Sequence, residues 1–176
     1  MPEYWDILDE NRNKTGRLHK RGQIQSLDKP IMKAGDFHLV VHVWILNDRG
    51  EFLISKRTPN KPFPNMWECT GGSVIAGDDS LTTALKEAKE ELGISLCKEN
   101  GELFKSYRGV EENGSGYFVD VWIFRQTVNL ADIIFQEDET CDARLVTKED
   151  INKLIDEGSF VSRYIFPYLD ELFDII

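Results

Sequence analysis

The sequence predicts an α+β layered domain, and three features of the chain support this prediction. Segments with the alternating pattern of β-strands occur in neighbouring pairs joined by turn residues, which indicates antiparallel pairing. An amphipathic helix follows shortly after Gly71 and Gly72, and two further helical segments close the chain. Strands that pair with one another, mixed with helices that each have one apolar face, form layers around a sheet.

The composition indicates one domain, over residues 1–176, and excludes several classes of protein. The formal net charge of −10 argues against binding to polymeric nucleic acid, which needs a basic surface. No apolar run approaches the roughly 20 residues of a membrane span, and the acidic first residues lack the apolar core of a signal peptide. We therefore expect a cytoplasmic protein without a membrane partner. The odd number of cysteines, without C-x-x-C spacing, predicts free thiols.

The N-terminal half is predicted to contain two hairpins and a loop. "YWDILDE" and "TGRLHKRG" flank the turn-rich "NRNK", so residues 1–35 form a short hairpin and a polar lead-in. "DFHLVVHVWILN" and "EFLISKR" flank the turn "NDRG" and predict a longer hairpin over residues 37–57. "TPNKPFPN" contains three prolines and is a loop, after which "MWECT" is a brief strand that leads to the glycine pair.

The C-terminal half begins with the predicted helix and then returns to strands. The apolar face of the helix consists of Leu81, Ala84, Leu85, Ala88 and Leu92. Asp79 or Ser80 is the predicted N-cap of this helix, and Gly93 is its stop signal. "ELFKSYRG" and "GYFVDVWIFRQTV" predict paired strands, and a further strand is expected near "ARLVT". Two helices are expected in "KEDINKLIDEG" and "SRYIFPYLDELFDII", with Pro167 near the start of the second or bending it. This last segment either packs on the sheet or forms a subunit contact.

Three glutamates lie together on the helix that follows the glycine pair. Glu87, Glu90 and Glu91 fall within an arc of about 100°, and like charges at these spacings repel one another. Hard divalent cations take carboxylate ligands, and a bound cation would remove the repulsion. The glycines allow the backbone to approach a metal or a phosphate closely. The alternative interpretation is a solvated helix face, because Lys and Glu are common on exposed helices.

Residues 72–94 resemble the Nudix box, the signature of the MutT-like Nudix hydrolases. The matching positions of the box fall in register on Gly72, Lys86, Glu87, Ala88, Glu90, Glu91, Gly93 and Ile94. Asp78 stands where the box has glutamate, and Lys86 stands where it has arginine. The resemblance implies a Nudix-type α/β/α sandwich with a mixed central sheet, to which the short N-terminal hairpin is added here.

The resemblance also implies a diphosphatase that cleaves a diphosphate linkage in a nucleoside diphosphate joined to another group. Its Mg²⁺ or Mn²⁺ ligands would be Glu87, Glu90 and Glu91 together with the carbonyl of Gly71. Glu90 and Glu91 are expected to contribute most to metal binding, and a box glutamate or a loop acid would activate the water. The partner is then a small nucleotide or diphosphate, and a homodimer is compatible with the family.

Several residues outside the helix are weaker candidates. Arg57 and Lys61 precede the glycine pair and are predicted to contact substrate phosphate, with Gly72 and His38 as further substrate contacts. His38 and His42 face the same side of a strand, which fits either a transition-metal site or a pair of core or pocket histidines. Loop acids supply an additional metal ligand or base in some Nudix enzymes, and the candidates are Glu111, Glu112, Glu137 and Glu139.

The N-terminal region resembles the Nudix branch related to isopentenyl diphosphate isomerase, which makes isomerase activity an alternative. The matching segments are "YWDILDENRNKTGRLHKRG", "FHLVVHVWILNDRGEFLISKR" and "NKPFPNMWE". His38 matches one metal-binding histidine of those enzymes. However, Gly71 occupies the place of their catalytic cysteine, and their acidic pair falls around Tyr117 and Val119. Hydrolysis is therefore the leading prediction, and a nucleotide-sensing domain without turnover is the other alternative.

Overall fold

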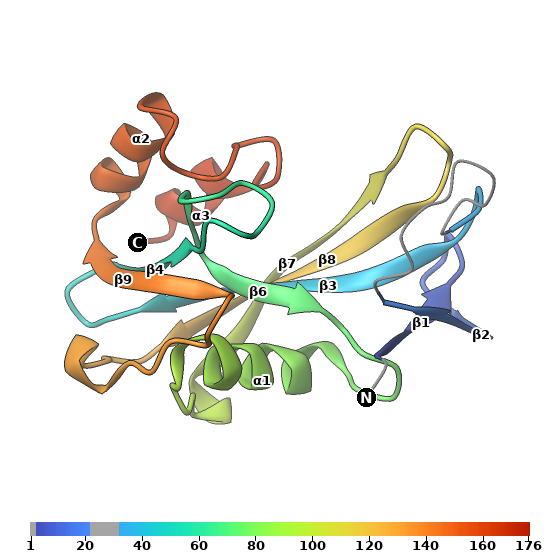
Figure 1. The fold of residues 1–176 in the computed structure, drawn as a ribbon, viewed down its shortest axis with the longest axis horizontal. Helices are drawn as coiled ribbons and strands as arrows, with labels where there is room; N and C mark the ends of the chain where they lie inside the picture. The colour runs from blue at the N-terminus through green and yellow to red at the C-terminus, as the bar shows by residue number, and fades with distance from the viewer. Residues whose placement is uncertain (1–2, 22–31) are drawn as a thin grey trace.

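The computed structural model describes residues 3–21 and 32–176, which form one mixed sheet with helices on both faces (Figure 1). The strands are β1 (Tyr4–Leu8), β2 (Lys14–Lys20), β3 (Phe37–Leu46), β4 (Phe52–Arg57), β5 (Trp67–Glu68), β6 (Thr70–Ser73), β7 (Gly101–Val110), β8 (Gly116–Arg125) and β9 (Thr140–Val146). The helices are α1 (Ser80–Leu92), α2 (Lys148–Asp156) and α3 (Leu169–Asp174), with 3₁₀ turns at Lys98–Asn100 and Leu130–Asp132. Residues 22–31 of the predicted lead-in lie outside the described residues.

Strand β3 is the axis of the sheet. Strand β8 runs parallel to it along its whole length, and β7 pairs with the outer edge of β8. The other edge of β3 is shared by three antiparallel partners: β1 at its start, β6 in the middle and β4 at its end. In this register Gly71 lies opposite His42 and Gly72 lies opposite Val41. The short N-terminal hairpin and the β7–β8 pair are confirmed. The hairpin predicted over residues 37–57 is paired only next to its turn, where Ile45 and Leu46 lie opposite Leu53 and Phe52, because β6 pairs with the middle of β3.

Two apolar cores cover the two faces of the sheet, because successive side chains of β3 point to opposite sides. Val41, Val43 and Ile45 pack with the apolar face of α1, including Ala88 and Leu92. The opposite core contains Trp44, Leu46, Tyr168, Ile151 and Leu172, and so joins β3 to the region of α2 and α3. Figure 1 shows α1 on one side of the sheet and α2 with α3 on the other. The predicted α/β/α arrangement is therefore confirmed.

Helix α1 has the predicted ends. Asp79 caps its first turn by accepting a hydrogen bond from the backbone N–H of Thr82 at 2.7 Å. Gly93 ends it in the left-handed conformation, with φ of 71°, which an L side chain adopts only with strain. These two caps fix which turn of the helix lies beside β6, and α1 packs on both β6 and β3.

The C-terminal segment differs from its prediction. Only Leu169–Asp174 is helical, whereas residues 162–168 form turns. Pro167 lacks an N–H and disfavours a helical conformation in the residue before it, so the helix begins only after the proline. Tyr168 and Leu172 are buried in the core that covers the sheet. Of the two predicted alternatives for this segment, the structure therefore shows packing on the sheet.

Two smaller predictions concern cysteines and membrane helices. Cys69, Cys97 and Cys141 are free thiols, and only Cys69 is buried. Within the described part of the chain, none of the helices has both the length and the apolar character needed to span a bilayer.

Candidate active site

The glycine pair of β6 creates the close approach on which the site depends. A Cβ atom at Gly71 would overlap the carbonyl oxygen of Val41, and one at Gly72 would overlap the carboxylate of Glu87. The carboxylate of Glu87 therefore lies directly against the backbone of Gly72. A side chain at Gly71 would clash with the backbone of β3, and one at Gly72 would displace the Glu87 carboxylate from this contact.

The three glutamates of α1 occupy different environments. Glu91 is buried, with 6% of its surface exposed, whereas Glu87 is partly buried and Glu90 is exposed. Burial raises the pKa of Glu91 to about 8, and the nearby charges of Glu87 and Glu68 act in the same direction. Burial and the charge of Glu90 raise the pKa of Glu87 to about 7. Two neighbouring carboxyls thus hold protons more strongly than an ordinary glutamate does.

The chemistry of this donor set fits a hard divalent cation. Two carboxyls in a poorly hydrated position repel each other when both are ionised, and a cation bound between them would replace the protons that they otherwise retain. The side-chain-free backbone of Gly71 and Gly72 leaves room for a carbonyl ligand. In residues 3–21 and 32–176, no three acidic, histidine or cysteine side chains are already grouped to hold a metal ion. The ligand set Glu87, Glu90, Glu91 and Gly71 stays a prediction.

Two of the predicted cationic residues lie at the site, but both are paired there. Nη1 of Arg57 donates to the carboxylate of Glu68 at 2.6 and 2.7 Å, and its Nε donates to the carbonyl of Pro62 at 2.5 Å. Lys61 forms an ion pair with Glu139. Burial lowers the pKa of Lys61, while the charge of Glu91 opposes that effect. Both cations are therefore held near the glycine pair by carboxylates.

A cavity of about 250 Å³ lies between Arg57 and the glycine pair. Its walls include Arg57, Glu68, Gly71 and Gly72, and on another side Arg21. The sequence did not single out Arg21, which follows β2 and is separated from the glycine pair by about fifty residues. Its Nη1 lies 2.6 Å from an oxygen of Glu3, and its charge lowers the pKa of Glu87. The only sequence signal was the basic run "HKRG" at the end of the N-terminal hairpin.

The two histidines of β3 are packed among aromatic rings. Nδ1 of His42 lies 2.8 Å from the hydroxyl of Tyr168, and burial lowers the pKa of His42 to about 3. His38 stacks on Trp5 with ring centroids 4.4 Å apart, and burial lowers its pKa to about 4. Both rings are therefore neutral near pH 7. These surroundings favour the interpretation as pocket and core histidines over a transition-metal pair.

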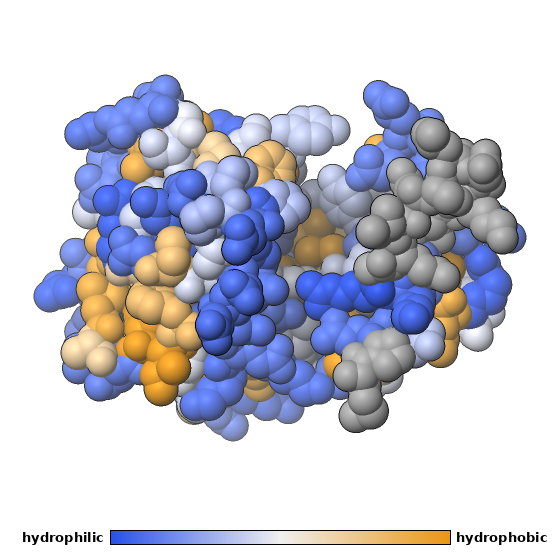
Figure 2. All heavy atoms as spheres, viewed as in Figure 1, coloured by the Kyte–Doolittle hydropathy of each residue, from blue (hydrophilic) through white to orange (hydrophobic). Residues whose placement is uncertain are grey.

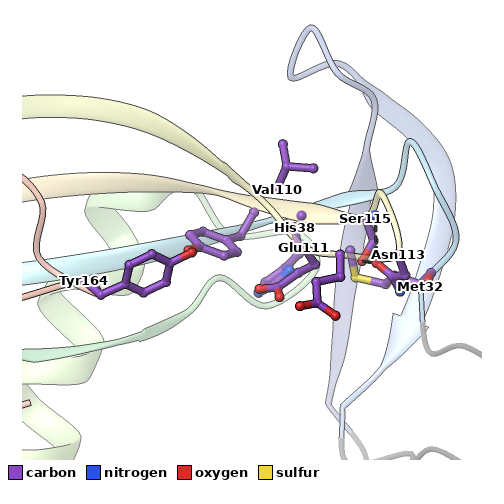
Figure 3. Close-up of a pocket in the computed structure, with 10 residues that line it drawn as sticks. Met32, His38, Val110, Glu111, Asn113, Ser115 and Tyr164 are labelled. Atoms are coloured by element: carbon purple, nitrogen blue, oxygen red, sulfur yellow. Dashed lines mark hydrogen bonds between the residues drawn. The ribbon is translucent and has the colours of Figure 1, made fainter. Parts of the chain in front are cut away.

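The four predicted loop acids separate in the structure. Glu139 reaches the site through its ion pair with Lys61, and Glu137 is exposed in the same loop. Glu111 and Glu112 lie between β7 and β8, where they line a different cavity together with His38 (Figure 3). Of the four, Glu139 is thus the one that lies beside a residue of the glycine-pair site.

Comparison with known proteins decides the family. The family model described as NUDIX domain matches residues 36–169. The chain belongs to the Nudix family. It is 37% identical over 175 residues to an uncharacterised Nudix hydrolase of Listeria monocytogenes, covering 98% of this chain and 95% of that protein. A similar protein of Listeria innocua is also 37% identical, with the same coverage. The chain is a Nudix hydrolase, and its box glutamates are those of α1.

Solved structures show the same fold. DR0079 from Deinococcus radiodurans superposes with a TM-score of 0.71 at 20% identity, covering 96% of this chain and 98% of that one. A MutT protein from Methanosarcina mazei Go1 gives a TM-score of 0.61 at 25% identity, covering 85% and 96%. The α+β Nudix fold predicted from the sequence is therefore confirmed.

Proposed function

We propose that this Nudix hydrolase cleaves the diphosphate linkage of a nucleoside diphosphate joined to another group, and that it needs a divalent cation. The observation that carries the proposal is the position of Glu87 and Glu91. Glu91 is buried and Glu87 is partly buried, both have raised pKa values, and the carboxylate of Glu87 lies against the backbone of Gly72. Such an arrangement is unfavourable in an isolated helix and becomes favourable when a cation binds.

The residues divide the work as follows. Mg²⁺ or Mn²⁺ would be held by Glu87, Glu90 and Glu91 with the carbonyl of Gly71, and when bound it would offset phosphate charge and lower the pKa of water. Glu91 would accept the proton of the attacking water, because burial and the nearby charge of Glu87 make its carboxylate more basic than that of an ordinary glutamate. Release of this proton to solvent would then return the carboxyl to its ionised form.

The cationic side chains of the cavity would orient the diphosphate. Arg57 and Arg21 both line it, and Lys61 lies near Glu91. Each is paired with a carboxylate, so binding of a phosphate requires only that an existing partner be shared or exchanged. Together with a bound divalent cation, these side chains would supply the positive charge that an anionic substrate needs in a chain with a net charge of −10.

We propose separately that the chain is related to the isomerase branch. The residues of the site, however, do not favour isomerase chemistry. The place of the catalytic cysteine is Gly71, whose Cα lies against the backbone of β3. Tyr117 and Val119, at the places of the acidic pair, line an adjoining apolar cavity. Neither side chain is a carboxylate. Incubation with isopentenyl diphosphate in deuterated water tests the alternative, and deuterium in recovered substrate or product would support it.

A release assay tests the proposed function. The protein is incubated with nucleoside di- and triphosphates, dinucleoside polyphosphates, nucleotide sugars, NADH and coenzyme A, with Mg²⁺, with Mn²⁺ and with a chelator. We expect monophosphate products from at least one compound, in the presence of metal only. Binding of a nucleotide by the folded protein without turnover of any compound would instead indicate a nucleotide-sensing domain.

A further inference from the structure

We call the cavity of about 250 Å³ beside Gly71 and Gly72 the catalytic cavity. A second and larger cavity continues from it along the face of the sheet opposite α1. It has a volume of about 650 Å³ and shares Val40, His42, Phe63 and Ile165 with the catalytic cavity. We call it the apolar groove; its remaining walls are His38, Tyr107, Glu111, Tyr117, Val119, Ser162 and Tyr164. Because the two cavities share four residues, a ligand whose diphosphate lies at Gly71 and Gly72 can extend directly into the groove.

The groove has a chemistry different from that of the catalytic cavity. Aromatic and aliphatic side chains make up most of its walls, and none of its described wall residues is a lysine or an arginine. Glu111, the first residue of the β7–β8 loop, is the acidic residue among them. The catalytic cavity, in contrast, contains Arg21 and Arg57. A phosphate in the groove would therefore lose water without gaining a cation.

Large apolar rings are exposed at the rim of the groove. Tyr164 and Phe63 both line the groove, and their side chains are 83% and 44% exposed to solvent. Figure 3 shows the ring of Tyr164 extending toward the side where His38 and Glu111 lie. Figure 2 shows a hollow on this side of the molecule with hydrophobic residues at its floor. Exposed aromatic side chains beside a cavity are typical of a surface that binds a ligand.

The backbone around the groove is fixed, so the walls are preformed. The hydroxyl of Tyr107 donates a hydrogen bond of 3.0 Å to the carbonyl of Ile165, which ties the turn at 162–168 to β7 across the groove. Tyr168 anchors the other end of that turn through its contacts with His42 and with Trp44, whose Nε1 donates to the tyrosine hydroxyl at 3.0 Å. A volume of this size lies in the range of sites for small organic ligands.

We propose that the apolar groove binds the organic group on one side of the diphosphate and selects groups that are uncharged and have an apolar or aromatic surface. Groups that carry a further phosphate are excluded from it. This proposal rests on the proposed hydrolysis of a diphosphate at the adjoining cavity. Two sources supply the required chemistry, namely the flat face of a nucleobase and a hydrocarbon chain.

The test uses adenosine diphosphate alkyl esters, in which the diphosphate joins adenosine to a chain of increasing length. If the chain occupies the groove, KM falls by about fourfold for each added methylene until the groove is filled. A terminal phosphate on the chain then raises KM by at least about tenfold, because it enters without a cation. If adenosine occupies the groove, chain length has little effect and an added 3′-phosphate raises KM instead. Either pattern supports the proposal.

Variants at the groove complete the test. Ile165→Asp, on the turn, places a charge between the two cavities, and Tyr164→Ala removes an exposed ring without disturbing the core. We expect both to raise KM with little change in kcat. Leu130→Asp and Leu130→Ala, at an exposed apolar residue of the Leu130–Asp132 turn, are the matched controls and should behave like wild type.

The outcomes distinguish the two proposals. Calorimetric titration of the same esters gives Kd independently of turnover. Absence of hydrolysis for every ester, with the predicted pattern of Kd intact, would overturn the proposed function and leave the groove supported. If neither KM nor Kd changes with chain length, with the added phosphates or in the groove variants, the apolar groove is not a substrate site, whatever the hydrolysis rate.

Discussion

Nζ of Lys86 lies 2.6 Å from Oδ2 of Asp78, so the two residues that depart from the Nudix box are paired with each other. The carboxylate of Asp78 raises the pKa of the Lys86 ammonium. The pair joins the first turns after β6 to the outer face of α1. Glu87 and Glu91 do not take part in this ion pair. Asp78 in place of glutamate and Lys86 in place of arginine therefore pair with each other and leave these two carboxyls in place.

Separating this pair should have a small effect on hydrolysis. Because the ion pair is solvent-screened, Lys86→Ala, Asp78→Asn and the double variant should all retain activity within about a factor of three. In urea unfolding, the loss of unfolding free energy in the double variant should not exceed the sum of the losses in the two single variants. A loss of activity limited to Lys86→Ala would show that the ammonium acts on the catalytic carboxylates instead of on Asp78.

Replacing Glu91 should make the metal-free protein more stable at high pH. The pKa of Glu91 is about 8 in the folded state against 4.5 for the ordinary side chain, so its contribution is fully present below pH 4.5 and is lost as pH rises through 8. Glu91→Gln removes this loss and should raise the free energy of unfolding at pH 9 by on the order of 2–4 kcal/mol. Urea denaturation at pH 5 and pH 9 measures it.

The control for Glu91→Gln is Glu149→Gln, at an exposed residue of α2. Its effect on the unfolding free energy should be small, because the side chain is exposed. If Glu91→Gln destabilises the protein equally at the two pH values, the carboxyl of Glu91 is not shielded from water as the structure places it.

Mg²⁺ should stabilise the protein more at high pH than at low pH. The cation needs ionised ligands, and the pKa values of Glu87 and Glu91 are about 7 and 8. At pH 8.5 the metal meets two carboxylates, whereas at pH 6 it must displace protons. Thermal melts with Mg²⁺ and with chelator should therefore show a larger rise in Tm at pH 8.5. An equal rise at both values would place the metal away from these two residues.

Gly72→Ala should inactivate the enzyme by moving Glu87. The added methyl group would overlap the Glu87 carboxylate, so the end of this side chain must shift away from the backbone of Gly72. Gly158→Ala is the control, because Gly158 has φ of 69° and open space around its Cα. It introduces backbone strain of about 1 kcal/mol without touching the site. Hydrolysis rates of the two variants, compared at equal folded fraction, separate the local effect from lost stability.

The sequence predicted the elements that depend on local pattern. The caps at Asp79 and Gly93 fixed the bounds of α1, and the turn residues fixed the hairpins. It predicted a C-terminal helix from Ser162, whereas Pro167 prevents residues 162–168 from joining α3. That difference matters for function, because this turn supplies Tyr164 and Ile165 to the apolar groove.

The site was predictable only where its residues share one short motif. Glu87, Glu90 and Glu91 follow from the box, but their different exposure depends on the packing of α1 against β6. Arg21 reaches the site from the N-terminal hairpin, and no local pattern reports a contact over such a separation. Conversely, Arg57 and Lys61 lie where the sequence predicted, yet their pairing with Glu68 and Glu139 is a tertiary feature.

The most direct test of the metal site is the rate of diphosphate hydrolysis by wild type, Glu91→Gln and Glu149→Gln, with Mg²⁺ and with chelator. We expect hydrolysis by wild type and Glu149→Gln with Mg²⁺ only, and a loss of at least about a hundredfold in Glu91→Gln, as for the removal of a group that acts in the transition state. Full activity of folded Glu91→Gln, or hydrolysis by wild type with chelator, would show that the buried carboxyls beside Gly72 do not carry the reaction.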